Sequence, residues 1–249
     1  MQHRLRLLAA AASCLPAISL AGPSDYVYVP SVEYGEREID IKLGTARAKD
    51  SEGGERASAS SVGFGYGATQ WWFTEAYVKY ARNPGQRTRY DAFEWENKFQ
   101  LTEPNRFAMD VGLITEIEIP RARREEGYEL KWGALVQFDT GVVRWNANLL
   151  LERVYRSREE GGHPTEMGYQ IQAKAPVRPG IEIGVQAFGD MGKWNHWERS
   201  EEQSHAMGPA IFGKIKFEGR QAIEYNAAWL MGSNAAPRRT VRVQAEYEF

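Results

Sequence analysis

Residues 93–119 read FEWENKFQLTEPNRFAMDVGLITEIEI, and the alternation in this stretch decides the fold class. On either side of a turn-forming centre at 102–106, every second residue is mostly apolar or aromatic, and the residues between are mostly charged, polar or small. This period of two places one face of a strand in an apolar medium and the other in a polar one. A helix would scatter the same residues around its circumference. The stretch therefore predicts two antiparallel strands joined by a turn.

The same alternation recurs from about residue 38 to residue 249. The expected strands are residues 39–45, 62–68, 72–80, 93–101, 107–119, 128–138, 143–151, 167–175, 181–187, 207–217, 225–231 and 241–249. Their number and their antiparallel order predict an all-β, up-and-down barrel of about twelve strands.

The connections between the expected strands alternate in length. Short ones rich in turn residues are expected at 69–71, 102–106, 139–141, 176–179 and 218–220. Longer, charged ones are expected at 47–56, 82–87, 120–126, 156–163, 192–202 and 233–238. A transmembrane barrel has this asymmetry, with short periplasmic turns and longer outer loops.

Composition does not separate a membrane barrel from a soluble protein. The 249 residues carry a net charge of -2, and the mean hydropathy is -0.54. No run of eighteen apolar residues follows the N-terminal region, which argues against a transmembrane helix bundle. A membrane barrel gives ordinary averages because only every second side chain of a strand meets lipid.

Two orientations of the alternating strands compete. A soluble lipocalin-like barrel turns its apolar face inward, whereas a membrane barrel turns it outward to lipid. The expected strands are long for a globular protein, and aromatic residues gather near the ends of their apolar face, as interfacial girdles do. The aromatic residues concerned are Trp72, Tyr80, Phe93, Phe107, Tyr128, Phe138, Trp145, Phe217, Tyr225 and Tyr247. Both features favour the membrane orientation.

The N-terminal region has the layout of a cleaved signal peptide over residues 1–21. Arg4 and Arg6 precede an apolar stretch, and residues 19–21 offer a cleavage site with small residues. A lipoprotein anchored at Cys14, the one cysteine, and a buried N-terminal helix are the alternatives. Residues 22–37 are expected to form a periplasmic lead-in, and residues 38–249 the barrel.

The C-terminal strand, residues 241–249, resembles the signal by which the barrel assembly machinery recognises outer-membrane proteins, with Tyr247 and Phe249 as its aromatic residues. Residues 93–104 and 208–217 resemble a group of uncharacterised, porin-like proteobacterial outer-membrane proteins, and the likeness runs over most of residues 60–249. The resemblance implies a Gram-negative outer-membrane location, with lipid, lipopolysaccharide and the assembly machinery as partners. It supplies no catalytic residue.

Oppositely charged residues are expected to pair inside the barrel near the short turns. The register set by three turns pairs Lys98 with Asp110, Lys174 with Glu182, and Glu224 with either Lys214 or Lys216. Such pairs either stiffen and narrow the lumen or take part in gating.

Acidic residues are expected to dominate the outer half of the lumen. The residues of this acidic vestibule are Glu116, Glu118, Glu129, Glu152, Glu166 and Asp190. The expected register sets Glu129 beside Glu152 and Glu166 beside Asp190. Either loop arginines compensate these charges, the candidates being Arg121, Arg123, Arg124, Arg156 and Arg158, or the vestibule attracts cations, as rings of carboxylates do in pores.

No catalytic residue, metal site, cofactor or nucleic-acid surface is predicted. His163, His196 and His205 all lie in or beside expected outer loops and form no recognisable serine–histidine arrangement. The leading hypothesis is therefore a narrow, passive channel or porin for small cationic or neutral solutes. A non-conducting barrel that binds a ligand or partner through its outer loops is the alternative, and an outer-membrane hydrolase is the third.

Overall fold

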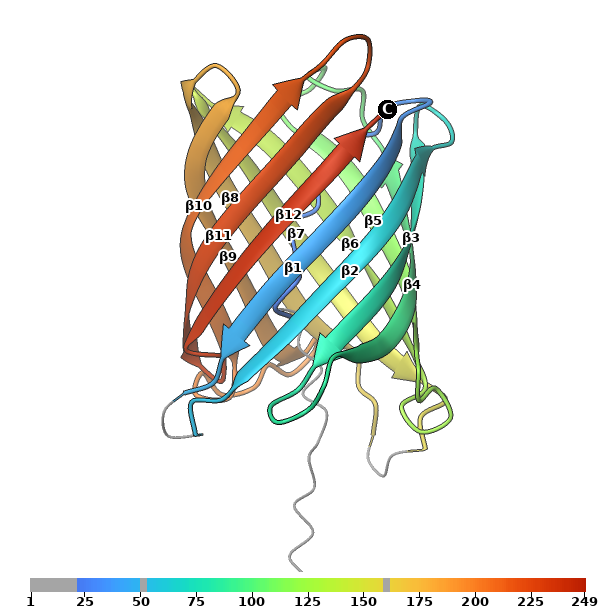
Figure 1. Ribbon diagram of the computed structural model, residues 1–249, viewed down its shortest axis with the longest axis vertical. Coiled ribbons are helices and arrows are strands. Elements are labelled where there is room, and N and C mark those ends of the chain that lie inside the picture. Colours follow the sequence, from blue (N-terminus) through green and yellow to red (C-terminus); the bar gives the residue numbers. More distant parts are fainter. Residues whose placement is uncertain (1–21, 50–52, 159–161) are drawn as a thin grey trace, which may run out of the picture.

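The computed structural model describes residues 22–49, 53–158 and 162–249, so the signal-peptide interpretation of residues 1–21 lies outside the described residues. The described chain forms a closed antiparallel barrel (Figure 1). Its strands are β1 (Arg37–Arg47), β2 (Arg56–Gly67), β3 (Trp72–Arg82), β4 (Arg89–Gln100), β5 (Asp110–Pro120), β6 (Tyr128–Thr140), β7 (Val143–Tyr155), β8 (Glu166–Arg178), β9 (Ile181–Lys193), β10 (Ser204–Lys216), β11 (Ala222–Asn234) and β12 (Arg239–Glu248). The predicted fold class is confirmed.

The first and last strands close the barrel. β1 pairs antiparallel with β12, with Ile39 opposite Tyr247 and Leu43 opposite Val243. Every other strand pairs with its neighbours in sequence. β1 begins and β12 ends at the same end of the barrel, at the top of Figure 1. We call this the turn end and the opposite end the loop end.

Connection lengths follow the predicted asymmetry with two exceptions. The turn-end connections are residues 68–71, 101–109, 141–142, 179–180 and 217–221, and the loop-end connections are residues 48–55, 83–88, 121–127, 156–165, 194–203 and 235–238. The connection 101–109 is longer than the predicted turn because β5 begins at Asp110 and not at Phe107. The connection 235–238 is short although it lies at the loop end, so the alternation of lengths is not strict.

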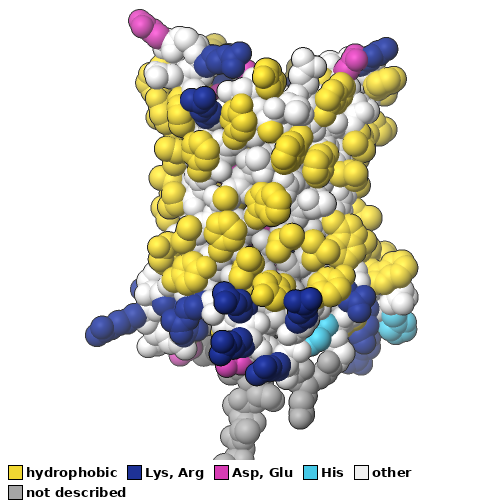
Figure 2. All heavy atoms as spheres, turned by 90° about the vertical axis from the view of Figure 1, so that its right-hand side faces the viewer, with side chains coloured by type: hydrophobic (Ala, Val, Ile, Leu, Met, Phe, Trp, Pro, Cys, Tyr) yellow, Lys and Arg dark blue, Asp and Glu magenta, His cyan; other side chains and the backbone are white. Residues whose placement is uncertain are grey.

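The apolar face of each strand points out of the barrel. Leu43 and Phe64 are 51% and 52% exposed, whereas Asp40 and Lys42, on the inward face of β1, are 1% and 4% exposed. Figure 2 shows hydrophobic side chains over the barrel wall, with many Lys and Arg side chains gathered at the loop end. This is the reverse of a soluble barrel, whose apolar face would be buried.

Residues 22–36, here called the N-terminal segment, run inside the barrel (Figure 1). The sequence placed these residues in a periplasmic lead-in and did not reveal their position in the lumen. Glycines of the wall provide the space: a Cβ atom at Gly44 would lie 1.7 Å from the Pro23 carbonyl oxygen, and one at Gly67 would lie 1.9 Å from that of Glu33. Gly67 also exchanges backbone hydrogen bonds with Gly35 and Glu36.

Among the described residues, no helix is long and apolar enough to cross a membrane.

Candidate functional site: the lumen and its N-terminal segment

Apolar side chains hold the N-terminal segment across the middle of the lumen. Val27 belongs to a buried cluster with inward residues of β9, β10 and β11, among them Phe188 and Leu230. Tyr28 belongs to a second cluster on the other side of the lumen, whose wall residues are Ile114, Leu135 and Leu150. Two successive residues of an extended chain point to opposite sides, so one short stretch contacts both walls.

Two tyrosine hydroxyls tie the segment to carboxylates of the wall. Tyr26 donates a hydrogen bond to Glu96 at 2.8 Å, and Tyr28 donates one to Glu116 at 2.9 Å. Burial raises the pKa of Tyr26 and of Tyr28, so both phenols stay protonated and remain donors. Gln170 accepts a bond from the Tyr28 amide at 3.2 Å. These contacts are polar anchors of the segment.

The guanidinium of Arg242 on β12 is a further contact point for the segment. It donates hydrogen bonds to the carbonyl oxygen of Asp25 and to Gln186, the latter at 2.8 Å. The guanidinium carbon also lies 3.8 Å from the ring centroid of Phe188. Burial raises the pKa of Asp25, although Lys131, Lys79 and Arg242 favour its ionised form.

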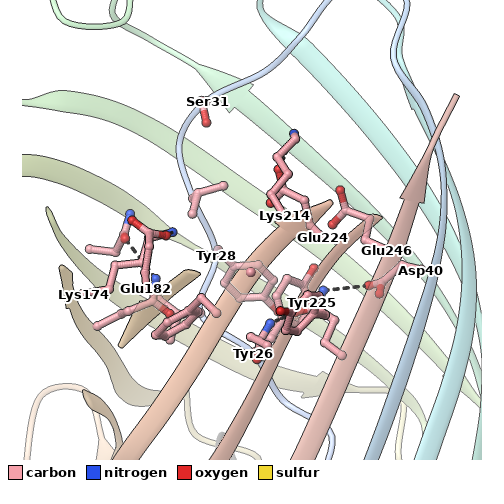
Figure 3. A pocket seen from close by; sticks show the side chains of 18 of the residues that line it. Tyr26, Tyr28, Ser31, Asp40, Lys174, Glu182, Lys214, Glu224, Tyr225 and Glu246 are labelled. Carbon is pink, nitrogen blue, oxygen red and sulfur yellow. Dashed lines mark hydrogen bonds and ion pairs between the residues drawn. The ribbon is translucent and has the colours of Figure 1, made fainter. Parts of the chain in front are cut away.

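A cavity of about 840 Å³ lies between the segment and the wall, mainly toward the turn end (Figure 3). Its acidic lining residues are Glu33, Glu36, Glu38, Asp40, Glu75, Glu96, Glu182, Glu224, Glu246 and Glu248, and its basic ones are Lys98, Arg144, Lys174, Arg178 and Lys214. The ten acidic side chains outnumber the five basic ones, so the cavity favours cations over anions.

Two of the predicted lysine–carboxylate contacts are present at the turn end. The Lys174 ammonium lies 2.6 Å from Glu182, although the register sets Pro176 opposite Glu182 and the contact is diagonal. Lys214 lies opposite Glu224 and forms an ion pair with it. Lys214 also contacts Glu248 of β12 at 2.8 Å, a partner that the hairpin register alone did not suggest. Lys216 lies opposite Ala222.

The predicted pairing of Lys98 with Asp110 is wrong. Lys98 lies opposite Ile114, and its ammonium lies over the ring of Phe73 at 4.8 Å from the centroid. Asp110 accepts a hydrogen bond from the Asn105 amide at 2.8 Å. The long connection 101–109 moves β5 along β4 by several residues, and register follows the true length of a turn.

Four of the six acidic residues predicted for the vestibule, Glu116, Glu118, Glu129 and Glu152, lie against two lysines of the strands. Lys79 lies 2.7 Å from Glu94 and 2.5 Å from Glu118. Lys131 lies 2.9 Å from Glu116. Lys131 also lies 3.8 Å from Glu152 and 4.0 Å from Glu129. The proposed vestibule is therefore a partly neutralised ion network, with compensating charges on the strands themselves.

The expected register within this acidic group is corrected, although the carboxyl groups of Glu129 and Glu152 remain neighbours and share a hydrogen bond. Glu129 lies opposite Glu118 and Val154, and Glu152 lies opposite Lys131 and Glu166. The two-residue turn at 141–142 shifts β7 by two positions relative to the predicted register.

Asp190 lies opposite Gly168, and Glu166 lies opposite Lys193. The two-residue connection 179–180 sets this register, and irregularities between Pro176 and Arg178 and between Glu166 and Gly168 each change it by one residue, as an inserted residue does in a bulge.

The histidines lie apart from the cavity. His163 and His196 lie in the loop-end connections, and His205 lies at the start of β10. The Nδ1 atom of His205 lies 3.1 Å from the Tyr169 hydroxyl, and its Nε2 atom lies 3.0 Å from the Gln203 side-chain oxygen.

Comparison with known proteins relates this chain to others by fold alone. No protein-family model and no curated protein matches the sequence. The structure is similar to the COG4313 outer membrane channel from Pseudomonas putida F1, with a TM-score of 0.59 and 10% identity over 92% of this chain and 100% of that one. It is also similar to the translocator domain of the autotransporter NalP from Neisseria meningitidis, with a TM-score of 0.51 and 10% identity over 87% and 88% of the two chains. The fold is thus that of outer-membrane β-barrel proteins.

Proposed function

We propose that this protein is an outer-membrane channel for small cationic or neutral solutes, and that its own N-terminal segment constricts the lumen. The observation that carries the proposal is the acid-rich cavity enclosed by a barrel whose apolar face points outward. The likeness in fold to an outer-membrane channel supports the same conclusion.

Membrane placement follows from the exposed wall. Exposed apolar side chains of this extent would be costly in water and are stable against lipid. Because the short turns and both barrel termini share one end, we assign the turn end to the periplasm and the loop end to the cell exterior. In this placement the loop-end Lys and Arg side chains face lipopolysaccharide. Tyr247 of β12 and Phe249, the residue after the strand, are presented to the assembly machinery.

The N-terminal segment limits the passage of solutes through the lumen. Val27 and Tyr28 contact opposite walls of the lumen, so this stretch crosses the path that a solute would take. Cation preference then arises from the excess of carboxylates along the cavity and not from an open acidic ring at the mouth, because Lys79 and Lys131 neutralise part of that ring.

Single-channel recording in planar bilayers tests this proposal. The native protein is expected to show small, infrequent conductance steps with a cation-selective reversal potential. Val27→Lys places an ammonium among apolar side chains near the buried Arg242, which displaces the segment and raises the open probability at least tenfold. Lys49→Gln, in a loop-end connection, is the control, because it leaves the lumen untouched and should not change the open probability.

A non-conducting barrel is the competing hypothesis, and the lumen's mid-barrel constriction favours it over hydrolysis. It would give no conductance steps in either the native protein or Val27→Lys, with folding verified by the mobility shift between unheated and heated samples in electrophoresis. That result would overturn the channel proposal.

A further inference from the structure

A buried lysine of the barrel wall contacts the N-terminal segment through an aromatic ring. Lys42 is on the inward face of β1, and its ammonium nitrogen lies 3.5 Å from the centroid of the Tyr26 ring. The same nitrogen lies 3.6 Å from the centroid of the Tyr77 ring of β3. One cation thus joins a residue of the segment to a residue of the wall. We call Tyr26, Lys42 and Tyr77 the lysine clamp.

The Tyr77 ring reaches Lys42 across β2, the strand that separates β3 from β1. Tyr77 lies opposite Gly63 of β2, and a Cβ atom at Gly63 would lie 2.4 Å from Cε1 of Tyr77. The ring therefore occupies space that a side chain would fill. The Tyr77 hydroxyl donates a hydrogen bond to Asp40 of β1 at 2.8 Å, which keeps the ring beside Lys42. The wall part of the clamp is thus held by contacts that do not involve the segment.

Separate contacts hold the Tyr26 ring in the segment. The Tyr26 hydroxyl donates its hydrogen bond to Glu96 of β4, on the far side of β3 from the strand that carries Lys42. The ring also meets Tyr28 edge to face, with the two centroids 4.8 Å apart. The hydroxyl and one edge of the ring are therefore occupied, and the face of the ring is left for the ammonium.

The carboxylate near Lys42 is a distant partner for its ammonium. Oδ2 of Asp40 lies 3.4 Å from the nitrogen, which is longer than the about 2.7–2.9 Å of a charge-assisted hydrogen bond. The same oxygen already accepts hydrogen bonds from Tyr77 and Gln244. A cation is attracted to the face of an aromatic ring, and more strongly where both are removed from water. Lys42 and Tyr77 are both buried, so the two rings contribute a large part of what stabilises this charge.

We propose that Lys42 is the residue that positions the N-terminal segment across the lumen, through the attraction between its ammonium and the face of Tyr26. When the segment leaves, Lys42 keeps Asp40 and Tyr77 but loses the Tyr26 ring. The place of the segment is thereby linked to one positive charge on β1. Lys42 acts on the constriction on which the proposed function rests, whether or not solutes pass.

Other lysines of the cavity lie over rings of the wall and not over a ring of the segment. The ammonium of Lys98 lies 4.8 Å from the centroid of Phe73, and that of Lys174 lies 5.3 Å from the centroid of Phe212. In both pairs the two residues belong to strands of the barrel. Loss of either lysine therefore leaves the contacts of Tyr26 in place, which makes Lys174 a matched control for Lys42.

Limited proteolysis of the folded, full-length protein in detergent tests the role of Lys42. Chymotrypsin can cleave after Tyr28 only when the segment has left the lumen, and mass spectrometry identifies this cut. Each rate is divided by the rate for a free peptide of residues 22–36 with the same residue 26. Lys42→Met removes the charge and keeps an apolar side chain, and it should raise the rate at least fivefold. Lys174→Met should change it less than twofold.

Variants of Tyr26 separate the clamp from a general effect on the wall. In a Tyr26→Leu background the ring is absent, so Lys42→Met should change the cleavage rate less than twofold. In a Tyr26→Phe background the ring face remains without its hydroxyl, and Lys42→Met should again raise the rate at least fivefold. An effect of one residue that depends on the other in this way measures their direct interaction.

Two results would overturn the role of Lys42. One is an unchanged rate in Lys42→Met protein whose barrel is closed by electrophoretic mobility. The other is an equal acceleration in the native and the Tyr26→Leu backgrounds, which would mean that Lys42 acts on the wall alone. If Lys42→Met does not fold, Tyr26→Leu should still be cleaved at least threefold faster than Tyr26→Phe, and equal rates would reject the clamp. Because cleavage is measured without passage of solute, the clamp and the channel proposal fail independently.

Discussion

The hydroxyl of Tyr28 lies 2.9 Å from a carboxylate oxygen of Glu116, in the interior of the barrel and 88 positions apart in the sequence. The same carboxylate accepts a hydrogen bond from Lys131 through its other oxygen at 2.9 Å. One glutamate thus connects the N-terminal segment to the ion network of the loop-end half, and displacement of the segment disturbs the charges of the lumen.

Tyr28→Phe should loosen the segment without opening the barrel. The substitution leaves the Lys131 contact of Glu116 in place and removes the hydrogen bond from the phenol, and such a bond contributes about 0.5–1.5 kcal/mol. We expect chymotrypsin to cleave after Tyr26 at least fivefold faster, with an unchanged mobility shift on heating. Tyr66→Phe, on the outward face of β2, is the control. Equal cleavage rates in all three proteins would show that this hydrogen bond does not hold the segment.

Gly44→Ala should displace the segment by steric clash. The three atoms nearest to a Cβ at this position all belong to Pro23 and Ser24, so the added methyl group meets the segment and not the wall. Overpacking of this kind costs about 1–3 kcal/mol. Bilayer recordings should show more frequent conductance steps. Gly162→Ala, where a Cβ meets no atom within 4 Å, should leave the recordings unchanged. A silent Gly44→Ala would mean that residues 23 and 24 do not limit passage.

Lys131→Met should strongly destabilise the barrel. The substitution leaves Glu116, Glu129 and Glu152 without their shared ammonium, and breaking a buried ion network by removing one partner costs about 3–5 kcal/mol. Urea unfolding followed by tryptophan fluorescence measures the loss, and the double variant Lys131→Met/Glu116→Gln should recover part of it. Arg144→Gln breaks only the exposed pair with Asp139 and should cost about 0–1 kcal/mol. Similar losses in both single variants would argue against a tightly coupled network.

Stability should fall as the pH rises toward neutrality, partly because of Glu36. Burial raises the pKa of Glu36 to about 7, with the attraction of Lys98 too weak to offset it. The folded protein therefore binds more protons at this carboxyl than the unfolded chain, whose glutamates ionise near pH 4.3 or so. The stabilising contribution is complete below about pH 4.3 and is lost as the pH rises through about 7.

Urea unfolding measured between pH 4.5 and pH 8 checks this expectation. After a discount for partial exposure, Glu36 should account for about 1–3 kcal/mol of the decline. Glu36→Gln should flatten the profile, whereas Glu103→Gln, at an exposed turn-end position, should not. A Glu36→Gln profile as steep as the native one would assign the decline to other groups.

The fold class and the two faces of each strand could be predicted from the residues alone. Alternation is a local property, because successive side chains of a strand point to opposite faces whatever their partner strand is. Residues 93–101 therefore indicated an apolar and a polar face without knowledge of β5. The sequence also predicted that Glu224 faces Lys214 or Lys216, and the structure places Lys214 opposite it.

The register across the connections and the contents of the lumen became known only from the folded barrel. The connections 101–109, 141–142 and 179–180 each moved the predicted partners, because the true length of a turn sets every later pair of its hairpin. Lys131 lies within one ion network with Glu116, Glu129 and Glu152 because β5, β6 and β7 are adjacent in the barrel. The path of residues 22–36 depends on glycines at Gly44 and Gly67, far apart in sequence, which leave room for a backbone only after the barrel has closed.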